Sequence, residues 1–240
     1  MINIDNVYQR VLALANKEQR GYITPQEFNL FANQAQKEIF EQYFYDVNQF
    51  RRIPGNDTFY SDVDDMLEEK LQIFENVDGS AAIQLYTNAG GGGLNKQLPD
   101  YIYRVHRVEL NNIDCEIMNT KDFNDVRLGG PLTRPSANRP VVNIRSNVMR
   151  CVADNNAFVT PTGLFYFREP ATVSWGYFVV NSKALYDSNS LSTVHFELHA
   201  SEETELIYKI LKFAGISMKR DDIMKAGQGL ENLQISQEKQ

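Results

Sequence analysis

Apolar positions recur at helical spacing along the first fifty residues. In residues 4–17 they are Ile4, Val7, Val11, Leu14 and Ala15, which predicts a first amphipathic helix. A longer stretch runs from about Thr24 to Phe50. Its apolar positions follow in steps of three or four: Phe28, Phe31, Ala35, Ile39, Tyr43, Val47 and Phe50. This stretch predicts one long helix whose other face is rich in Gln, Asn, Lys and Glu.

The long helix also has a well-defined start. Gly21 ends the preceding helical stretch, and Thr24 can cap the free amides of the next one. Pro25 fits the first helical position, where its missing N–H costs nothing, and Glu27 completes a capping box. After a turn in 54–57, Ser61 is expected to cap a third helix that reaches about Phe74.

From about residue 80 the pattern changes to the alternation typical of strands. Turn chemistry interrupts it at Asn111–Asn112 and at 161–163. A short helix at 120–128, capped by Thr120, and a loop at 129–140 separate the strands. The predicted strands are 82–86, 101–110, 115–118, 141–145, 148–153, 164–168 and 171–180.

Helical spacing returns near the C-terminal end. Ser201 is expected to cap a helix that ends at Gly215, and a second stretch begins at Asp221 and frays into the polar residues 234–240. The order of helices, strands and helices predicts an α+β protein. We expect residues 1–78 and 199–240 to form one helical bundle and residues 79–198 to form an inserted antiparallel β domain.

Composition narrows the function classes only slightly. A net charge of −7 argues against a surface that binds nucleic acid all over, although a local basic patch remains compatible. Cys115 and Cys151 do not make a disulfide framework, so we expect reduced thiols in a protein made in a cytoplasm. The sequence has neither a signal-peptide pattern nor an apolar run long enough to span a membrane.

The charges are distributed unevenly. Residues 126–153 contain no Asp or Glu and five arginines, whereas 57–78 and 202–205 are acidic. One hypothesis is that the basic segment of one subunit meets the acidic surface of the next, and another is that it contacts DNA in a channel. A solvated loop with strand faces is the simpler interpretation. The arginines concerned are Arg127, Arg134, Arg139, Arg145 and Arg150.

Candidate catalytic patterns are few. The glycines at 90–93 lack the spacing of a phosphate-binding loop, and no Gly-x-Ser-x-Gly occurs. His195, Glu197 and His199 would share one face of a strand and could meet a metal, but hydrogen bonding at a strand edge is the simpler use. We therefore expect no catalytic residue, no cofactor and no metal.

Residues 18–45 and 195–227 together resemble the terminal helices of head–tail connector proteins (adaptor, ring or head-completion proteins) of short-tailed, crAss-like bacteriophages. Residues 139–178 resemble the β region of that family. The resemblance implies a non-enzymatic virion protein at the head–tail junction. Such a protein forms a ring, by analogy a homo-oligomeric dodecamer, beneath the portal protein.

In such a ring, packaged double-stranded DNA passes through the channel, and the next tail protein binds below. The C-terminal segment of these connectors often engages the portal, which makes Ile223, Met224 and Leu230 candidate docking residues; packing on the protein's own bundle is the alternative. Two other classes stay open, namely a more distal nozzle or fibre-docking component and a tail-associated hydrolase with paired carboxylates.

Overall fold

The computed structural model describes residues 1–15, 23–50, 58–89, 95–189, 191–217, 225 and 227–233. The chain is a mixed α and β protein, in agreement with the predicted α+β class, and most of its strand pairs are antiparallel. Contacts divide it into two compact units, which we call unit 1 (1–73 and 170–240) and unit 2 (74–169). Predictions that concern Gly21, 54–57, 90–93, 221–224 and 234–240 lie outside the described residues.

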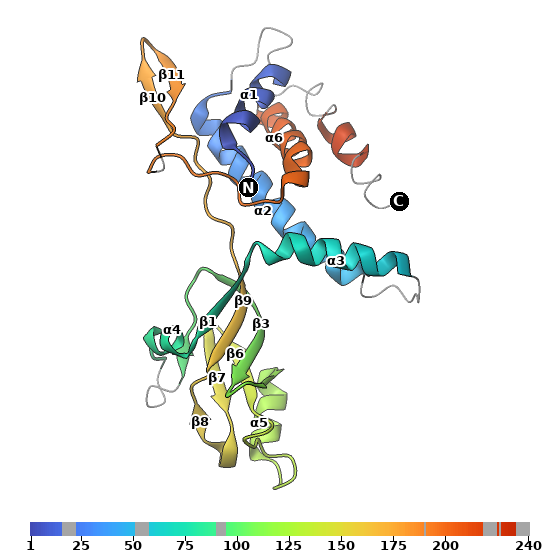
Figure 1. The fold of residues 1–240 in the computed structure, drawn as a ribbon, viewed down its shortest axis with the longest axis vertical. Coiled ribbons are helices and arrows are strands. Elements are labelled where there is room, and N and C mark those ends of the chain that lie inside the picture. The colour runs from blue at the N-terminus through green and yellow to red at the C-terminus, as the bar shows by residue number, and fades with distance from the viewer. Residues whose placement is uncertain are drawn as a thin grey trace. The chain divides into compact units, whose positions relative to one another are not determined.

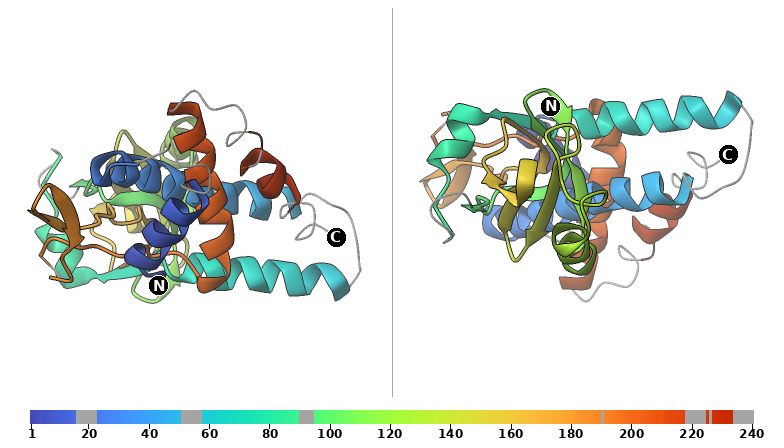
Figure 2. Two further views of the ribbon diagram at one scale, coloured as in Figure 1. Left: turned by 90° about the horizontal axis from the view of Figure 1, so that it is seen from above. Right: turned by 90° about the horizontal axis from the view of Figure 1, so that it is seen from below.

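Unit 1 contains the long helices (Figure 1). Both α1 and α2 pack against α6, and α2 also packs against α3 (Figure 2). The capping box is present as predicted: the Thr24 amide donates to Glu27 Oε2 at 3.0 Å, and the Glu27 amide donates to Thr24 Oγ1 at 3.3 Å. The helices are α1 (Ile4–Ala15), α2 (Pro25–Phe50), α3 (Thr58–Gln72) and α6 (Glu203–Ser217).

The core of unit 1 follows most of the predicted apolar stripes, although Leu14 of the first stripe is exposed. Along α2, Phe28, Ala35, Ile39 and Tyr43 are buried, and so are Ala32 and Phe40 beside them. The ring of Tyr8 in α1 lies 4.6 Å from Phe28 and 4.5 Å from Trp175, and its hydroxyl donates to Ile23 O at 3.0 Å. Unit 1 also holds a two-stranded hairpin of β10 (Tyr177–Val180) and β11 (Lys183–Tyr186).

Unit 2 is built from two sheets with a shared apolar core. One sheet has the order β1-β9-β3-β4, and the other has the order β2-β7-β6-β5 with β8 beside β7. The core takes Val108, Leu164 and Tyr166 from the first sheet and Val142 and Met149 from the second. The strands are β1 (Glu75–Gly79), β2 (Lys96–Gln97), β3 (Ile102–Leu110), β4 (Ile113–Asp114), β5 (Glu116–Met118), β6 (Val141–Arg145), β7 (Val148–Val152), β8 (Phe158–Val159) and β9 (Gly163–Arg168).

One strand pair in unit 2 is parallel. Strands β5 and β6 run in the same direction because α5 (Thr120–Leu128) and the loop at 129–140 carry the chain back between them. A parallel pair needs a connection of this length, whereas an antiparallel pair can use a tight turn. The tight turns occur where they were predicted or at similar Asn-rich dipeptides, and Asn111 and Asn112 both adopt positive φ. Helix α5 covers one face of this sheet through Phe123.

Several local predictions are wrong. Residues 82–86 belong to α4 (Ser80–Leu85) and its end, because a short apolar run does not distinguish strand from helix. Helix α3 begins at Thr58, so Ser61 lies inside it. Helix α6 continues through Gly215, since one glycine inside a helix costs only about 1 kcal/mol.

The helix caps also shift by one or two positions. Asn119 caps α5 by accepting from the Asp122 amide at 2.9 Å, so Thr120 is already helical. His199 caps the 3-10 turn at 200–202 that precedes α6, and it does so by accepting from the Ser201 amide at 3.3 Å. In both places a neighbouring side chain with an acceptor atom replaces the hydroxyl that was predicted.

Candidate interaction surfaces

The polar face of α2 binds an extended segment of the chain through side-chain amides. The Asn29 amide group accepts from the Trp175 amide at 2.8 Å and donates to the Trp175 carbonyl at 3.4 Å. Asn33, one turn later, accepts from the Val173 amide at 2.8 Å and donates to the Val173 carbonyl at 2.9 Å. Each asparagine side chain therefore bonds to both the N–H and the C=O of one residue in the segment, as a neighbouring strand would.

A third amide continues the series along the helix. Gln36 donates to the Ala171 carbonyl at 2.9 Å and accepts from the Glu197 amide at 3.3 Å. The carboxylate of Glu197 then accepts from the Ala171 amide at 2.8 Å. We call Asn29, Asn33 and Gln36 the amide ladder. It explains why residues 171–176 belong to no strand, although 171–180 was predicted as one strand; within this segment only Ser174 forms a β-bridge, with Val194.

The amide ladder leads directly into the β10–β11 hairpin. Trp175 donates from its indole N–H to Asp5 Oδ1 at 2.9 Å, and its ring lies 5.8 Å from those of Tyr177 and Tyr186. The base of the hairpin is thus fixed by aromatic packing. Beyond this base, large apolar side chains are exposed on both strands, namely Phe178, Val179, Val180 and Leu185. Exposed apolar groups on a two-stranded hairpin are typical of a protein interface.

The C-terminal helical residues 227–233 pack on α6 through a buried ionic cluster. Glu231 accepts from Lys209 Nζ at 2.7 Å and from Lys212 Nζ at 3.0 Å, and Lys209 also pairs with Glu205 at 3.2 Å. A side chain at Gly227 would lie 3.1 Å from the Lys212 backbone nitrogen, so the two helices approach closely. We call this the ionic clamp.

Proximity of opposite charges shifts both partners of the ionic clamp toward their charged forms. Burial alone would lower the pKa of Lys209, but its hydrogen bond to Glu231 and the nearby carboxylates raise that pKa instead. Burial alone would likewise raise the pKa of Glu231, but hydrogen bonds from Lys209 and Lys212 lower it. The predicted docking residue Leu230 lies on the same helix with 41% of its surface exposed. Ile223 and Met224 are outside the described residues.

The five arginines differ in their local contacts. Arg139 pairs with Glu116 at 3.0 Å, Arg127 lies 5.4 Å above the Phe158 ring, and Arg134 Nε donates to the Gly129 carbonyl at 3.1 Å. These three surround α5 and the loop that follows it. Arg145 and Arg150 are exposed, and neither side chain has an ion pair within the described part of the chain.

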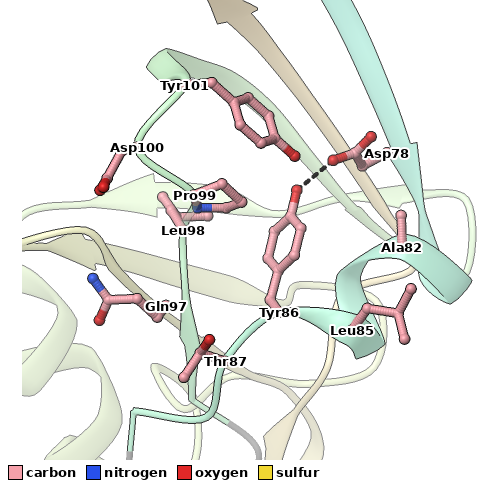
Figure 3. Close-up of a pocket in the computed structure, with 10 residues that line it drawn as sticks. All are labelled: Asp78, Ala82, Leu85, Tyr86, Thr87, Gln97, Leu98, Pro99, Asp100 and Tyr101. Atoms are coloured by element: carbon pink, nitrogen blue, oxygen red, sulfur yellow. Dashed lines mark hydrogen bonds between the residues drawn. The ribbon is translucent and has the colours of Figure 1, made fainter.

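A cavity of about 510 Å³ lies in unit 2 beside α4 (Figure 3). Two tyrosine hydroxyls donate to Asp78 at its wall, Tyr86 by a short hydrogen bond and Tyr166 at 3.3 Å. Burial and the nearby Asp78 raise the pKa of both phenols, so both are neutral at pH 7. The cavity therefore holds a carboxylate, neutral donors and aromatic faces, which suit a cationic or apolar side chain better than a reaction.

The three residues that could have met a metal instead form local hydrogen bonds. His195 accepts from the Ile4 amide at 3.3 Å, while Glu197 and His199 serve the amide ladder and the 3-10 cap. Within the described residues no group of three His, Cys, Asp or Glu side chains could hold a metal ion. No helix in the described ranges is both long and apolar enough to cross a membrane.

The two cysteines lie together in the core of unit 2. Both are buried and free, and Cys115 and Cys151 share a hydrogen bond. That bond lowers the pKa of Cys115 and, together with burial, raises the pKa of Cys151. Neither thiol is exposed to solvent, which is unlike a reactive cysteine.

No family model matches the chain, and no curated protein matches it at a significant level.

Proposed function

We propose that this chain is a bacteriophage virion protein that forms a head-to-tail connector ring beneath the portal. The resemblance of residues 18–45 and 195–227 to connector helices supports the proposal. So does the order of the chain, in which residues 74–169 make one compact unit between two parts of another. In this proposal the first and last helices form a bundle into which the β-rich unit is inserted.

The observation that carries the proposal is the β10–β11 hairpin. Its base is fixed by Trp175, yet Phe178 and Val179 expose their apolar side chains. An apolar surface on a rigid base loses little entropy when a partner covers it, so it suits a permanent assembly contact. A connector needs such contacts with the portal, with its own neighbours and with the next tail protein.

The work of this protein would be mechanical. The ring, with twelve subunits by analogy, extends the DNA channel and joins the capsid vertex to the tail. The net charge of −7 suits a lumen through which DNA slides without sticking. Residues of the C-terminal segment, including Leu230, would reach the portal after the ionic clamp opens. No catalytic residue takes part.

Electron microscopy of purified protein mixed with its candidate portal tests the proposal. The expected result is a ring added to one end of the portal, with the protein alone as control. The double variant F178S/V179S should abolish ring addition, whereas V77S, at an exposed valine of unit 2, is the matched control and should not. A wild-type protein that ignores the portal would overturn the connector function and favour a more distal tail component or a hydrolase.

A further inference from the structure

The loop that follows α5 presents an apolar and cationic tip. Leu132 is 99% exposed and Leu128 is 74% exposed, and Arg134 is exposed beside them. Arg134 uses its Nε on the Gly129 carbonyl, which leaves its two terminal nitrogens without a partner among the described residues. The tip thus presents exposed apolar side chains next to a guanidinium that can form a bidentate pair with a carboxylate.

Internal hydrogen bonds fix this loop. The amides of Thr133 and Arg134 both donate to the Gly130 carbonyl, at 3.0 and 3.2 Å, and Thr133 Oγ1 donates to the same oxygen at 3.0 Å. A Cβ atom at Gly129 would overlap with Thr133 Oγ1, so the tight turn requires glycine there. The tip is therefore organised before any partner binds, which reduces the entropy lost on binding.

The cavity beside α4, which Tyr86 and Tyr101 line and which we call the tyrosine cavity, has chemistry complementary to that of the loop. Its described lining contains two carboxylates, Asp78 and Asp100, and no basic side chain. Leu85, at its edge, is 87% exposed, and Tyr101 presents an exposed ring (Figure 3). A leucine and a guanidinium entering this cavity would find an apolar rim, aromatic faces and negative charge.

The loop and the cavity lie toward opposite ends of strand β6. The loop leads into Val141, where β6 begins, and the turn after β6 reaches the cavity, because the Leu98 amide donates to the Asn147 carbonyl at 2.6 Å. Five strand residues span about 13 Å between first and last Cα. The fixed loop thus cannot enter the cavity of its own chain.

We infer that the loop at 129–134 of one copy docks into the tyrosine cavity of a second copy. Since the two surfaces differ and lie at opposite ends of unit 2, the contact is head-to-tail, and repeating it gives a ring or an open chain. The inference deepens the proposed connector function and rests on its ring of identical subunits. It assigns Leu132 and Arg134 as the inserted groups and Asp78, Asp100 and Tyr101 as their receptors.

Cysteine cross-linking tests the contact without any portal. The variants L132C and L85C are made separately, because both sites are exposed and the native thiols are buried. A short bismaleimide should join L132C to L85C in a mixture and should join neither variant to itself. The control is L191C, at a leucine that is 92% exposed in unit 1. A mixture of L132C and L85C that cross-links no more than L132C with L191C overturns the inference.

The double variant L85C/L132C distinguishes a head-to-tail contact from a closed dimer. A head-to-tail contact should give a ladder of cross-linked species, whereas dimers alone would overturn the head-to-tail arrangement. Adding R134E to L132C should reduce cross-linking about tenfold, and D100R in the L85C partner should restore it. If the protein forms the cross-linked species but does not bind the portal, the loop–cavity contact is retained and the connector function is rejected. If it binds the portal but forms no cross-linked species, the connector function is retained and the loop–cavity contact is rejected.

Discussion

Two segments of unit 1 are held to its long helices by polar side chains, one by the amide groups of α2 and the other by charged groups of α6. The amide ladder binds residues 171–175 to α2 through neutral Asn and Gln side chains. The ionic clamp binds residues 227–233 to α6 through Glu231 and two lysines. Neutral hydrogen bonds do not respond to pH, whereas ion pairs do. The amide ladder is therefore a permanent attachment, whereas a change of pH can release the ionic clamp.

The largest effect is expected from breaking the middle of the amide ladder. Replacing Asn33 with Ala leaves the amide and carbonyl of the buried Val173 without partners. The free energy of unfolding should fall by about 2–4 kcal/mol, because each buried group that loses its hydrogen bond costs about 1–3 kcal/mol. Urea denaturation measures this change.

The matched control for that variant lies on the same helix. Asn48 donates to the Phe44 carbonyl at an exposed site, so N48A should change the free energy of unfolding by less than about 0.5 kcal/mol. Equal effects of N33A and N48A would contradict a structural role for the ladder.

A smaller and more local effect is expected from breaking the ionic clamp. In E231A, Lys209 keeps Glu205 and gains access to water as the C-terminal helix leaves α6. The free energy of unfolding should fall by only about 1–2 kcal/mol, and hydrogen exchange should accelerate in 225–233 alone. G227V should release the same helix by steric conflict with Lys212, and E41A, at an exposed glutamate of α2, should not. Slow exchange of this helix in both E231A and G227V would refute the clamp.

The pH dependence of the two attachments should differ. The pKa of Glu231 is lowered in the folded protein, so its stabilisation is present above the ordinary glutamate value near 4.3 and is lost as pH falls through the lower folded value. The pKa of Lys209 is raised, so its contribution is complete below about 10.4 and is lost as pH rises through the higher folded value. Exchange in 225–233, corrected for intrinsic rates, should therefore rise at both extremes.

The amide ladder supplies the internal comparison for that measurement. Exchange of the Val173 and Trp175 amides should show no step at either extreme until the whole unit unfolds, because both amides donate to Asn side chains, which do not titrate. The variant E231Q should lose the acid step while it keeps the alkaline one. An acid step that persists in E231Q would assign it to another group.

The smallest effect on stability is expected at the hairpin tip. F178S/V179S removes apolar groups that are already in water, so the free energy of unfolding should change by less than about 0.5 kcal/mol. V173S, at the buried segment that the ladder holds, is the contrasting variant and should cost several times more. A large destabilisation by F178S/V179S would mean that the hairpin supports the fold and is not a docking surface.

The two attachments also show what sequence can predict. The helix spacing and the capping box of α2 follow from local residue types, so they were predictable. The Asn and Gln side chains at 29, 33 and 36 stand at helical spacing on one face, which is a signal in retrospect. Their partners lie more than 130 residues away along the chain, and nothing local indicates them.

The same limit applies to the candidate surfaces. The arginine cluster was visible in the sequence, but only the fold shows that Arg127, Arg134 and Arg139 have contacts of their own. The tyrosine cavity brings Asp78 and Tyr86 together with Tyr166, which is 80 residues further along the chain than Tyr86, through strand pairing. Residues 82–86 were assigned to a strand, and that error concealed α4, which forms one wall of the cavity.

The chain enters and leaves unit 2 at neighbouring points, because the Arg168 amide donates to the Phe74 carbonyl at 2.9 Å. Residues 74–169 can thus be regarded as an exchangeable cassette whose two ends meet. A linker of about two residues would reconnect the remaining chain, as in a tight hairpin. Evolution can insert, lose or replace such a cassette without changing the path of the chain in unit 1. Related proteins would then differ most between residues 74 and 169.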